Sequence, residues 1–531
     1  MYISSSEVSN GGALPKHEEE TGACSFVVAS SMFTASRVFS ALLGAVRGFL
    51  LAKWLGPAAY GTWQFVNIFG HYGVYAGLGT RAGISREIPF LRGGGNFRRM
   101  SAVLGTAFAA NLYGPLSYGL IVLGCSFFVL ETVDAKALAM FSPVIVLTSL
   151  VGYGGTLAMA MGLYDVRTKL GLLEDLLTGF LTVGFVYIWG VYGAIAGFGL
   201  AALIAAIYAA WRLWQYLALG IDWRMFLNLV VIGLPIMGNG ILLTTMGTAD
   251  QILIAAMLGR EMLGVYGLMR SGVVVLQAIP ASLGQVLFVK FAELDGKNQS
   301  NEGITHLLDK TTLILSAVLA PILSSAAALL PLVIVLFLPE FTEGIQAGQV
   351  LIGALFFMGV SLPATNWCVS TLRNGPVLAL RIAVVAAECG ALYWVISVGG
   401  GLEAIASIVL AAFASFSVAI MIISNYLLGT TISGGFVRAI RSGLPFLAIA
   451  VVLLLQSGFS QTGSSFVETH LFISVGVNLV CGLLVSAAFV MWIDRRTHFL
   501  RVISRTFGAI LRLPGRNLAK VSAGKLFRIK S

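Results

Sequence analysis

Charged residues are scarce in this chain of 531 residues, and their scarcity excludes a water-soluble fold. Asp, Glu, Lys and Arg make up 11% of the residues, hydrophobic residues make up 58%, and the mean hydropathy is +0.91. A soluble domain of this size would expose too much apolar surface and aggregate. The sequence therefore predicts an integral membrane protein.

Other signals are missing, and each absence argues against a class of function. The five cysteines stand singly, without a CxxC pair or a Cys/His cluster, so we expect neither disulfides nor a metal site. Residues 1–24 lack the apolar core of a signal peptide. No GxxxxGK[ST] nucleotide-binding loop occurs, so we expect no cofactor, and any use of ATP would need another chain.

The positive charge of the chain is concentrated in its tail. The formal net charge is +10, and residues 495–531 hold ten basic and no acidic residues, which leaves 23 of each sign in the rest. No soluble basic domain exists that could hold a duplex, so we expect no nucleic-acid partner.

The basic tail has the pattern of an amphipathic helix. On a helical wheel, Arg501, Arg505, Arg512 and Arg516 fall within roughly 60°, and apolar residues occupy the opposite arc. Such a helix lies on the anionic cytoplasmic leaflet, so we expect contact with anionic membrane lipids. The helix either only enforces topology, or it concentrates an anionic substrate or docks a biosynthetic partner.

Apolar segments divide the body of the chain into fourteen predicted membrane spans, since about 20 apolar residues cross the hydrocarbon core. The predicted segments are a cytoplasmic lead (1–24), an N-lobe of six spans (25–214), a linker (215–225), a C-lobe of six spans (226–430), two further spans (431–494) and the basic tail (495–531). We expect an all-helical polytopic membrane protein.

Basic residues alternate between the loops and predict the orientation. One set of loops is rich in Arg and Lys, whereas the other contains only Lys53, Lys136 and Arg260, so the first set and both termini are expected in the cytoplasm. The outer loops are short, at about 15 residues or fewer by the span boundaries. A membrane glycosyltransferase or polymerase usually needs a large outer catalytic loop, so we expect a transporter and not an enzyme.

An internal repeat relates the two predicted lobes. At an offset of 203 residues, Leu55-Gly56 aligns with Leu258-Gly259 and Gly61 with Gly264. The first glycine of each pair suits a tight turn, and the second allows close helix packing. Six spans separate the copies, so the lobes have the same orientation and are related by an axis along the membrane normal.

Motifs in the first, second, seventh and eighth spans resemble those of bacterial polysaccharide flippases. They include Leu55-Gly56-Pro57-Ala58-Ala59-Tyr60-Gly61, Gly233-Leu234-Pro235-Ile236 and Ala249-Asp250-Gln251-Ile252. These Wzx-type proteins belong to the multidrug/oligosaccharidyl-lipid/polysaccharide exporter (MOP) superfamily. The resemblance implies a bacterial inner-membrane protein that flips a polyprenyl-pyrophosphate-linked oligosaccharide by alternating access, with a polymerase and glycosyltransferases as possible partners. The alternatives are an ion-coupled drug antiporter of the same superfamily or, further away, a glycosyltransferase or polymerase.

Four ionisable residues fall inside predicted spans, where each needs a partner or an aqueous cavity. These are Arg37, Arg47, Asp250 and Arg270. Either the arginines bind the pyrophosphate or acidic sugars of the substrate while Asp250 balances charge or couples an ion, or Asp250 forms a structural bridge with Arg47 or Arg270. Glu388 is a second candidate for ion coupling. The energy source itself stays open.

A polar stripe follows one face of the second span. Its members are Tyr60, Gln64, Asn67, His71 and Tyr75, which occupy a sector of roughly 80°. The stripe either lines a sugar-binding cavity or forms helix-to-helix hydrogen bonds. His71 is a candidate for titration during coupling.

Three further charges lie near the cytoplasmic ends of spans. Arg81 is either an interfacial anchor or an early phosphate contact, and no partner can be named for Glu174 or Asp175.

Overall fold

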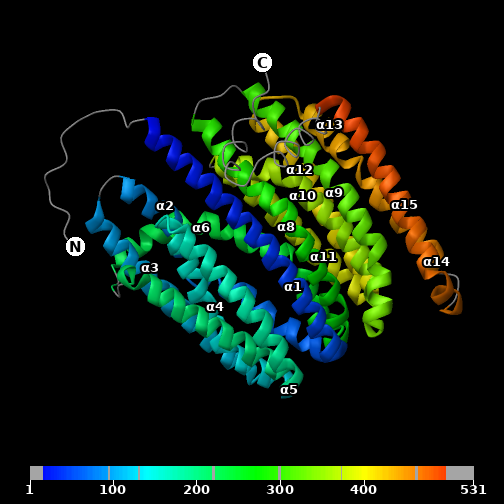
Figure 1. Ribbon diagram of the computed structural model, residues 1–531, viewed down its shortest axis with the longest axis horizontal. Helices are drawn as coiled ribbons and strands as arrows, with labels where there is room; N and C mark the ends of the chain where they lie inside the picture. Colours follow the sequence, from blue (N-terminus) through cyan, green and yellow to red (C-terminus); the bar gives the residue numbers. More distant parts are fainter. Residues whose placement is uncertain are drawn as a thin grey trace. The chain divides into compact units, whose positions relative to one another are not determined.

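The computed structural model describes residues 16–93, 96–128, 132–217, 220, 222–296, 301–371, 373–460 and 464–497 (Figure 1). Every regular element among them is a helix, so the predicted all-helical fold class is confirmed. Residues 37–497 form one compact unit, which contains all the contacts described below, and residues 1–36 with 498–531 form another. The predicted tail helix lies outside the described residues. The expected lead is helical from Lys16 onward, because the first helix continues beyond the apolar stretch that hydropathy detects.

The first half of the chain forms α1 (Lys16–Gly73), α2 (Thr80–Gly93), α3 (Phe97–Ser126), α4 (Thr132–Ala160), α5 (Tyr164–Leu213) and the short 3₁₀ helix η1 (Trp214–Tyr216). The second half forms α6 (Trp223–Met246), α7 (Ala249–Met257), α8 (Arg260–Gly296), α9 (Asn301–Phe337), the 3₁₀ helix η2 (Pro339–Gly344), α10 (Ile345–Ser370), α11 (Asn374–Ser397) and α12 (Leu402–Leu427). The chain then continues through α13 (Ile432–Gly443), α14 (Phe446–Ser460) and α15 (Ser464–Thr497).

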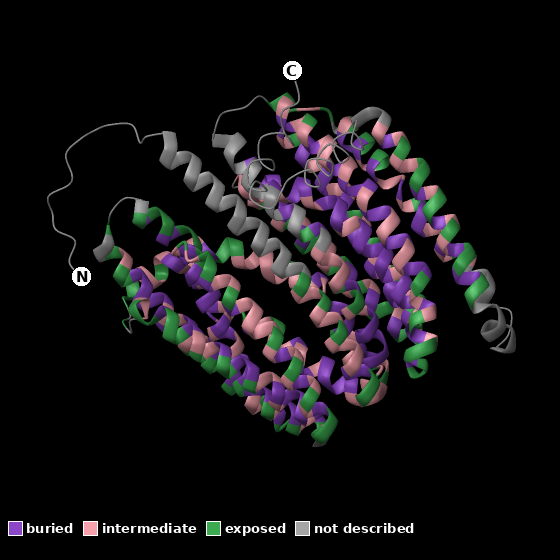
Figure 2. Ribbon diagram, in the orientation of Figure 1, coloured by how far each residue is buried: buried purple, intermediate pink, exposed green. Residues whose placement is uncertain are grey.

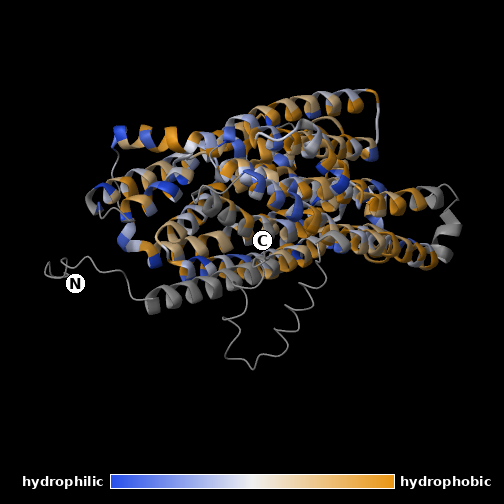
Figure 3. Ribbon diagram, turned by 90° about the horizontal axis from the view of Figure 1, so that it is seen from above, coloured by the Kyte–Doolittle hydropathy of each residue, from blue (hydrophilic) through white to orange (hydrophobic). Residues whose placement is uncertain are grey.

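The helices are apolar along most of their length (Figure 3). Within the described residues, ten are long and apolar enough to cross a membrane, or eleven if the bent pair α13 and α14 forms one span. Two of them, α1 and α5, each contain two predicted spans, joined at Gly56 (φ 69°) and Gly190 (φ 60°). Glycine enters this left-handed region without a steric penalty, so the chain turns there. The multi-span architecture is confirmed, and the number fourteen stays a prediction.

Two predicted spans are interrupted. The second predicted span, which carries the polar stripe, is broken between α1 and α2, where Leu78 (φ 49°) and Gly79 (φ 79°) both adopt left-handed backbone and cannot continue a right-handed helix. The seventh predicted span, the first of the C-lobe, is broken between α6 and α7. The expectation of continuous spans is wrong here, because hydropathy responds to apolar side chains and not to backbone direction.

The helices around α1 and α8 follow the repeat. Helix α8 covers residues 260–296, and the segment after the Gly56 turn, from 57 to the end of α2 at 93, has the same length and lies 203 residues earlier. Gly56 and Gly259 are both left-handed, as the predicted tight turns require. We call the end of the bundle that contains these turns the hairpin end. The opposite end, at η1 and the start of α6, is the linker end.

Helices α1 and α8 cross at the hairpin end with their backbones in contact. A Cβ on Gly61 would lie 1.7 Å from the carbonyl oxygen of Arg260, and a Cβ on Gly264 would lie 1.9 Å from the carbonyl oxygen of Pro57. Residues 57 and 260 are themselves 203 apart, so the crossing is two-fold symmetric. The close packing expected at both glycines is present.

Most buried apolar residues in the described part of the chain belong to two large clusters. Burial is greatest around α10, which packs against α8, α9 and α12 (Figure 2). A second cluster at the linker end joins α2, α3 and α4, and it includes Leu229 of α6, which is fully buried. The first half of α6 therefore packs on helices of the predicted N-lobe, although its sequence was assigned to the C-lobe.

The crossing generates a stability prediction. Replacing Gly264 by Ala places a methyl group into the backbone of α1, and we expect the overpacking to lower stability by about 1–3 kcal/mol. The measurement is the melting temperature of detergent-purified protein, together with its amount in the membrane. Gly272→Ala is the matched control, because it makes the same change in the same helix where no atom lies within 4 Å. A melting temperature as high in Gly264→Ala as in the control would contradict the close crossing.

Candidate functional site

The second half of α1 faces α6 and α8 across the boundary between the predicted lobes, which we call the seam. At its hairpin end, Gln64 Nε2 donates hydrogen bonds to Tyr60 Oη (3.2 Å) and to Ser271 Oγ (3.0 Å) of α8. Gly267 lies opposite Gln64, and a Cβ there would approach the Gln64 amide to 2.9 Å. Residues 64 and 267 are related by the repeat, so glycine in one lobe makes room for the amide of the other.

Hydroxyl groups connect the seam towards the linker end. Tyr72 Oη lies 2.9 Å from Thr248 Oγ1, and Tyr75 Oη lies 2.7 Å from Thr244 Oγ1. Thr244 lies in the last turn of α6 and Thr248 directly precedes α7, whereas Tyr72 lies at the end of α1 and Tyr75 in the turn between α1 and α2. The two interrupted helices therefore meet at their interruptions.

The middle of the polar stripe is more open. Asn67 Nδ2 donates to the carbonyl oxygen of Trp63 (2.7 Å) within its own helix. The His71 side chain is exposed and makes no hydrogen bond with a described residue. The two ends of the stripe therefore form helix-to-helix hydrogen bonds, and the lining of a sugar-binding cavity by its centre stays a prediction.

Asp250 is fully buried at the start of α7. Its Oδ2 accepts a hydrogen bond from Tyr266 Oη (2.6 Å) and lies 3.6 Å from Arg270 Nη1. Arg270 Nη2 also donates to the carbonyl oxygen of Gly247 (3.0 Å) at the helix break. Of the two bridges considered from the sequence, the structure forms Asp250–Arg270, which lies within the C-lobe and braces the start of α7 against α8.

Helix α11 carries two buried charges of opposite sign. Glu388 is 2% exposed, and neither of its carboxylate oxygens has a hydrogen-bond partner among the described residues; Asp250 and Arg270 are the charges that act on it. Arg381 is 5% exposed and donates from Nη1 to the carbonyl oxygen of Asn239 in α6 (3.0 Å). The C-lobe thus holds two carboxylates close to a single shared arginine.

The N-lobe holds a different cluster, in which arginine predominates. Asp175 in α5 accepts a hydrogen bond from Ser40 in α1. The charges of Asp175 and Glu174 both act on the half-buried Arg47 guanidinium. The hydrogen-bond partner that the sequence could not name for Asp175 therefore comes from α1, and the positive charges that act on Glu174 come from α5, α2 and α1.

Arg81 extends the same cluster through α2. The charges of Arg167 and Glu174 act on it, and its Nε donates to Thr156 Oγ1 (2.9 Å) in α4. The guanidinium packs against Gly152, where a Cβ would lie 2.5 Å from Nη2. Glycine at 152 is therefore needed to seat this arginine.

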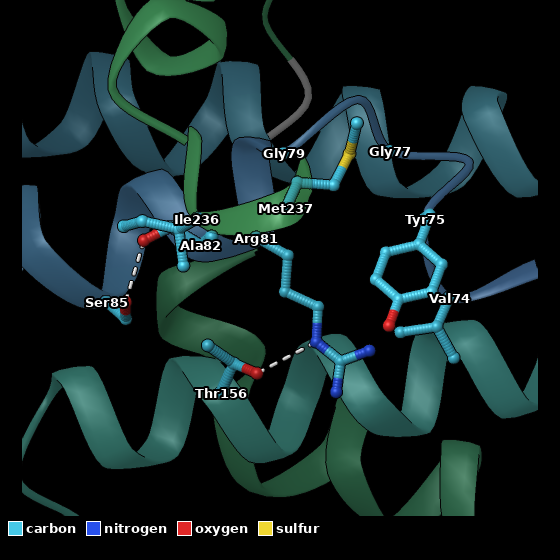
Figure 4. Close-up of a pocket in the computed structure, with 10 residues that line it drawn as sticks. All are labelled: Val74, Tyr75, Gly77, Gly79, Arg81, Ala82, Ser85, Thr156, Ile236 and Met237. Atoms are coloured by element: carbon cyan, nitrogen blue, oxygen red, sulfur yellow. Dashed lines mark hydrogen bonds between the residues drawn. The ribbon is translucent and has the colours of Figure 1, made fainter. Parts of the chain in front are cut away.

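A cavity of about 260 Å³ opens beside Arg81 (Figure 4). It lies between the turn that joins α1 to α2, the first turns of α2, and α4 and α6. The lining residues are Val74, Tyr75, Gly77, Gly79, Arg81, Ala82, Ser85, Thr156, Ile236 and Met237. The combination of one guanidinium, three hydroxyl groups and apolar walls suits an anionic group attached to an apolar or sugar moiety.

The predicted site residues thus divide into separate groups. Arg47 and Arg81 lie in the N-lobe cluster, and Asp250, Arg270 and Glu388 lie together in the C-lobe. The side chain of Arg37 lies outside the described residues. Arg167, Thr244 and Ser271 were missed, because their importance depends on neighbours distant in the sequence. No group of three His, Cys, Asp or Glu side chains in the described part of the chain could hold a metal ion.

Solved structures with the same fold are transporters. The lipid II flippase MurJ in an inward closed conformation superposes with a TM-score of 0.64 at 12% identity, covering 87% of this chain and 99% of that protein. A multidrug resistance MATE family transporter of the MOP superfamily superposes in its inward-facing conformation with a TM-score of 0.60 at 14% identity, covering 81% and 100%. An outward-facing MATE structure gives 0.58 at 13%, covering 76% and 95%.

Sequence comparison adds a family likeness. Residues 102–345 match the model of a family described as polysaccharide biosynthesis protein. Comparison with curated proteins gives no match. The solved structures named above are transporters, and the family likeness agrees with the resemblance seen in the sequence motifs. The chain carries the fold of MOP-superfamily transporters and is similar, over 102–345, to the polysaccharide biosynthesis proteins.

Proposed function

We propose that this protein translocates a polyprenyl-pyrophosphate-linked oligosaccharide outward across the bacterial inner membrane by alternating access. Both termini lie in the cytoplasm in this proposal, so the linker end faces the cytoplasm and the hairpin end faces outward. The sequence likeness to polysaccharide biosynthesis proteins and the fold shared with MurJ, a lipid II flippase, support this class of cargo.

The observation that carries the proposal is the arginine cluster of the N-lobe. The charges of Arg47, Arg81 and Arg167 all act on Glu174, and the charge of Asp175 acts on Arg47, so these three arginines and two carboxylates sum to a formal charge of +1. An arginine in the membrane region needs an anion or water as partner. A pyrophosphate offers several oxygens in the geometry that guanidinium groups bind in pairs, so it fits this cluster better than a neutral or cationic ligand does.

The C-lobe supplies a candidate site for ion coupling. Arg270 pairs with Asp250, and the charges of both act on Glu388, so these three side chains sum to a formal charge of −1. A buried carboxyl group without a hydrogen-bond partner is strongly disfavoured as an anion, so Glu388 is suited to take up a proton or a small cation. Coupling through this group would link an ion gradient to the movement of an anion in the other lobe.

A second candidate function is an ion-coupled antiporter for cationic drugs. The unpaired carboxylate of Glu388 and the fold shared with MATE transporters favour it. Measuring the efflux of ethidium from cells distinguishes the two candidate functions, because an oligosaccharide transporter is expected not to export the dye.

In the proposed partnership, the polymerase acts on the translocated oligosaccharide and glycosyltransferases supply it. The basic tail at 495–531 would hold the cytoplasmic face against anionic lipids.

The arginine cluster predicts selective binding of a diphosphate. We expect Arg81→Gln and Arg47→Gln to weaken binding of undecaprenyl diphosphate to the purified protein at least tenfold, or about 1.4 kcal/mol. Binding of undecaprenol, which has the same tail without the diphosphate, is expected to stay unchanged. Titration by microscale thermophoresis measures both ligands. Arg212→Gln is the control, because this arginine is exposed on α5. Parental affinity for the diphosphate in both cluster variants would rule out the assigned anion site.

Glu388 generates a prediction about coupling. Replacing it by Gln keeps the shape of the side chain and removes its charge, so we expect polymer export that no longer responds to external pH or sodium. Export is measured as surface polysaccharide in a complemented deletion strain at several pH values and sodium concentrations. Glu403→Gln, at an exposed position on α12, is expected to keep the parental response. If export by Glu388→Gln responds to pH and sodium as the parental protein does, Glu388 has no role in ion coupling.

A further inference from the structure

One ion pair crosses the seam at the hairpin end. Asp134 lies at the start of α4 in the N-lobe, and Arg260 is the first residue of α8 in the C-lobe. Both residues fall in segments that the sequence assigned to short outer loops. The structure instead buries them, with Asp134 fully buried and the Arg260 side chain 17% exposed.

Contacts from several neighbouring residues hold the pair. One carboxylate oxygen of Asp134 pairs with Arg260 Nε, and the other accepts a hydrogen bond from Thr62 Oγ1 (2.7 Å). Arg260 Nη1 donates to the carbonyl oxygen of Ala255 (3.0 Å), and the guanidinium lies 3.7 Å from the centre of the Phe65 ring. Asp134, Thr62 and Phe65 belong to the N-lobe, so the guanidinium of Arg260 is enclosed mainly by the opposite lobe.

No other ion pair in the described part of the chain joins the two lobes. The remaining three are Arg99–Glu87 in the N-lobe, and Arg270–Asp250 and Arg438–Asp309, which lie beyond the N-lobe. The other contacts at this end are uncharged: Tyr60 packs edge-on against Phe341, Phe49 packs against Phe337, and Gln64 donates a hydrogen bond to Ser271.

We propose that Asp134 and Arg260 form the latch that keeps the hairpin end closed, and that the pair separates when the protein opens at this end. In the closed state each charge compensates the other, and in the open state water solvates both. A variant that neutralises one partner leaves the other buried and unpaired only in the closed state. The equilibrium then shifts towards the open state, since a change affects populations only through its different effect on the two states.

A cysteine-accessibility experiment tests the latch in the full-length protein. The five native cysteines are replaced by alanine, and Ser271→Cys serves as the reporter because Ser271 lies in the seam near the crossing. A membrane-impermeant maleimide is added to right-side-out and to inverted vesicles. Asp134→Asn and Arg260→Gln are expected to increase the labelling rate at least fivefold from the side of the hairpin end. Asp309→Asn, which removes a carboxylate from an ion pair that does not cross the seam, is expected to label at the parental rate.

A disulfide provides the complementary measurement. In a chain with Asp134→Cys and Arg260→Cys and without the reporter, oxidation is expected to abolish polymer export, and reduction is expected to restore it. Unchanged labelling in both neutral variants, or full export by the oxidised double-cysteine protein, would overturn the latch. The labelling needs no cargo, so its outcome is independent of whether the substrate is the proposed oligosaccharide.

Discussion

The crossing of α1 and α8 at Gly61 and Gly264 is the contact on which the candidate site depends. Because neither residue has a side chain, the two backbones touch. Gly61 lies against the carbonyl group of Arg260, and Gly264 lies against the carbonyl group of Pro57, the counterpart of Arg260 in the repeat. This approach brings Gln64 within reach of Ser271 and places the start of α8 beside Phe65. A larger residue at either glycine would separate every polar pair that joins the lobes at the hairpin end.

The repeat is symmetric at the crossing and asymmetric away from it. Helix α8 continues unbroken to residue 296, whereas its counterpart is interrupted before Thr80. Arg47 and Asp250 occupy equivalent positions but have opposite charge, and each lies in a cluster of its own sign. The repeat therefore gives both lobes a similar backbone arrangement at the crossing. Different side chains and helix breaks then give the lobes different chemistry, with an excess of arginine in the N-lobe cluster and an excess of carboxylate in the C-lobe cluster.

Hydropathy and the repeat predicted the helices, the tight turns at Gly56 and Gly259 and the close packing at Gly61, because each of these is a property of local sequence. The breaks were not predictable in this way, since Leu78 adopts a left-handed backbone that its side chain does not signal. The partners in the site were missed for another reason. Ser40 and Asp175 lie 135 residues apart, and Asp134 is paired with Arg260, which lies in the opposite lobe. Pairings over such distances follow from tertiary packing, which no local pattern reports.

The seam between the two charged clusters is made of uncharged groups. The difference between neutral and charged contacts matters for a protein whose lobes must separate. A hydrogen bond between neutral groups contributes only about 1 kcal/mol net, because water or a sugar hydroxyl replaces the lost partner. The contacts of Tyr72 and Tyr75 with threonines are of this kind. A charged pair needs much stronger compensation when it separates, and the described seam contains such a pair only at the hairpin end. Much of the resistance to opening is thereby concentrated at one end, and the middle of the seam is left free to exchange partners with a hydroxyl-rich cargo.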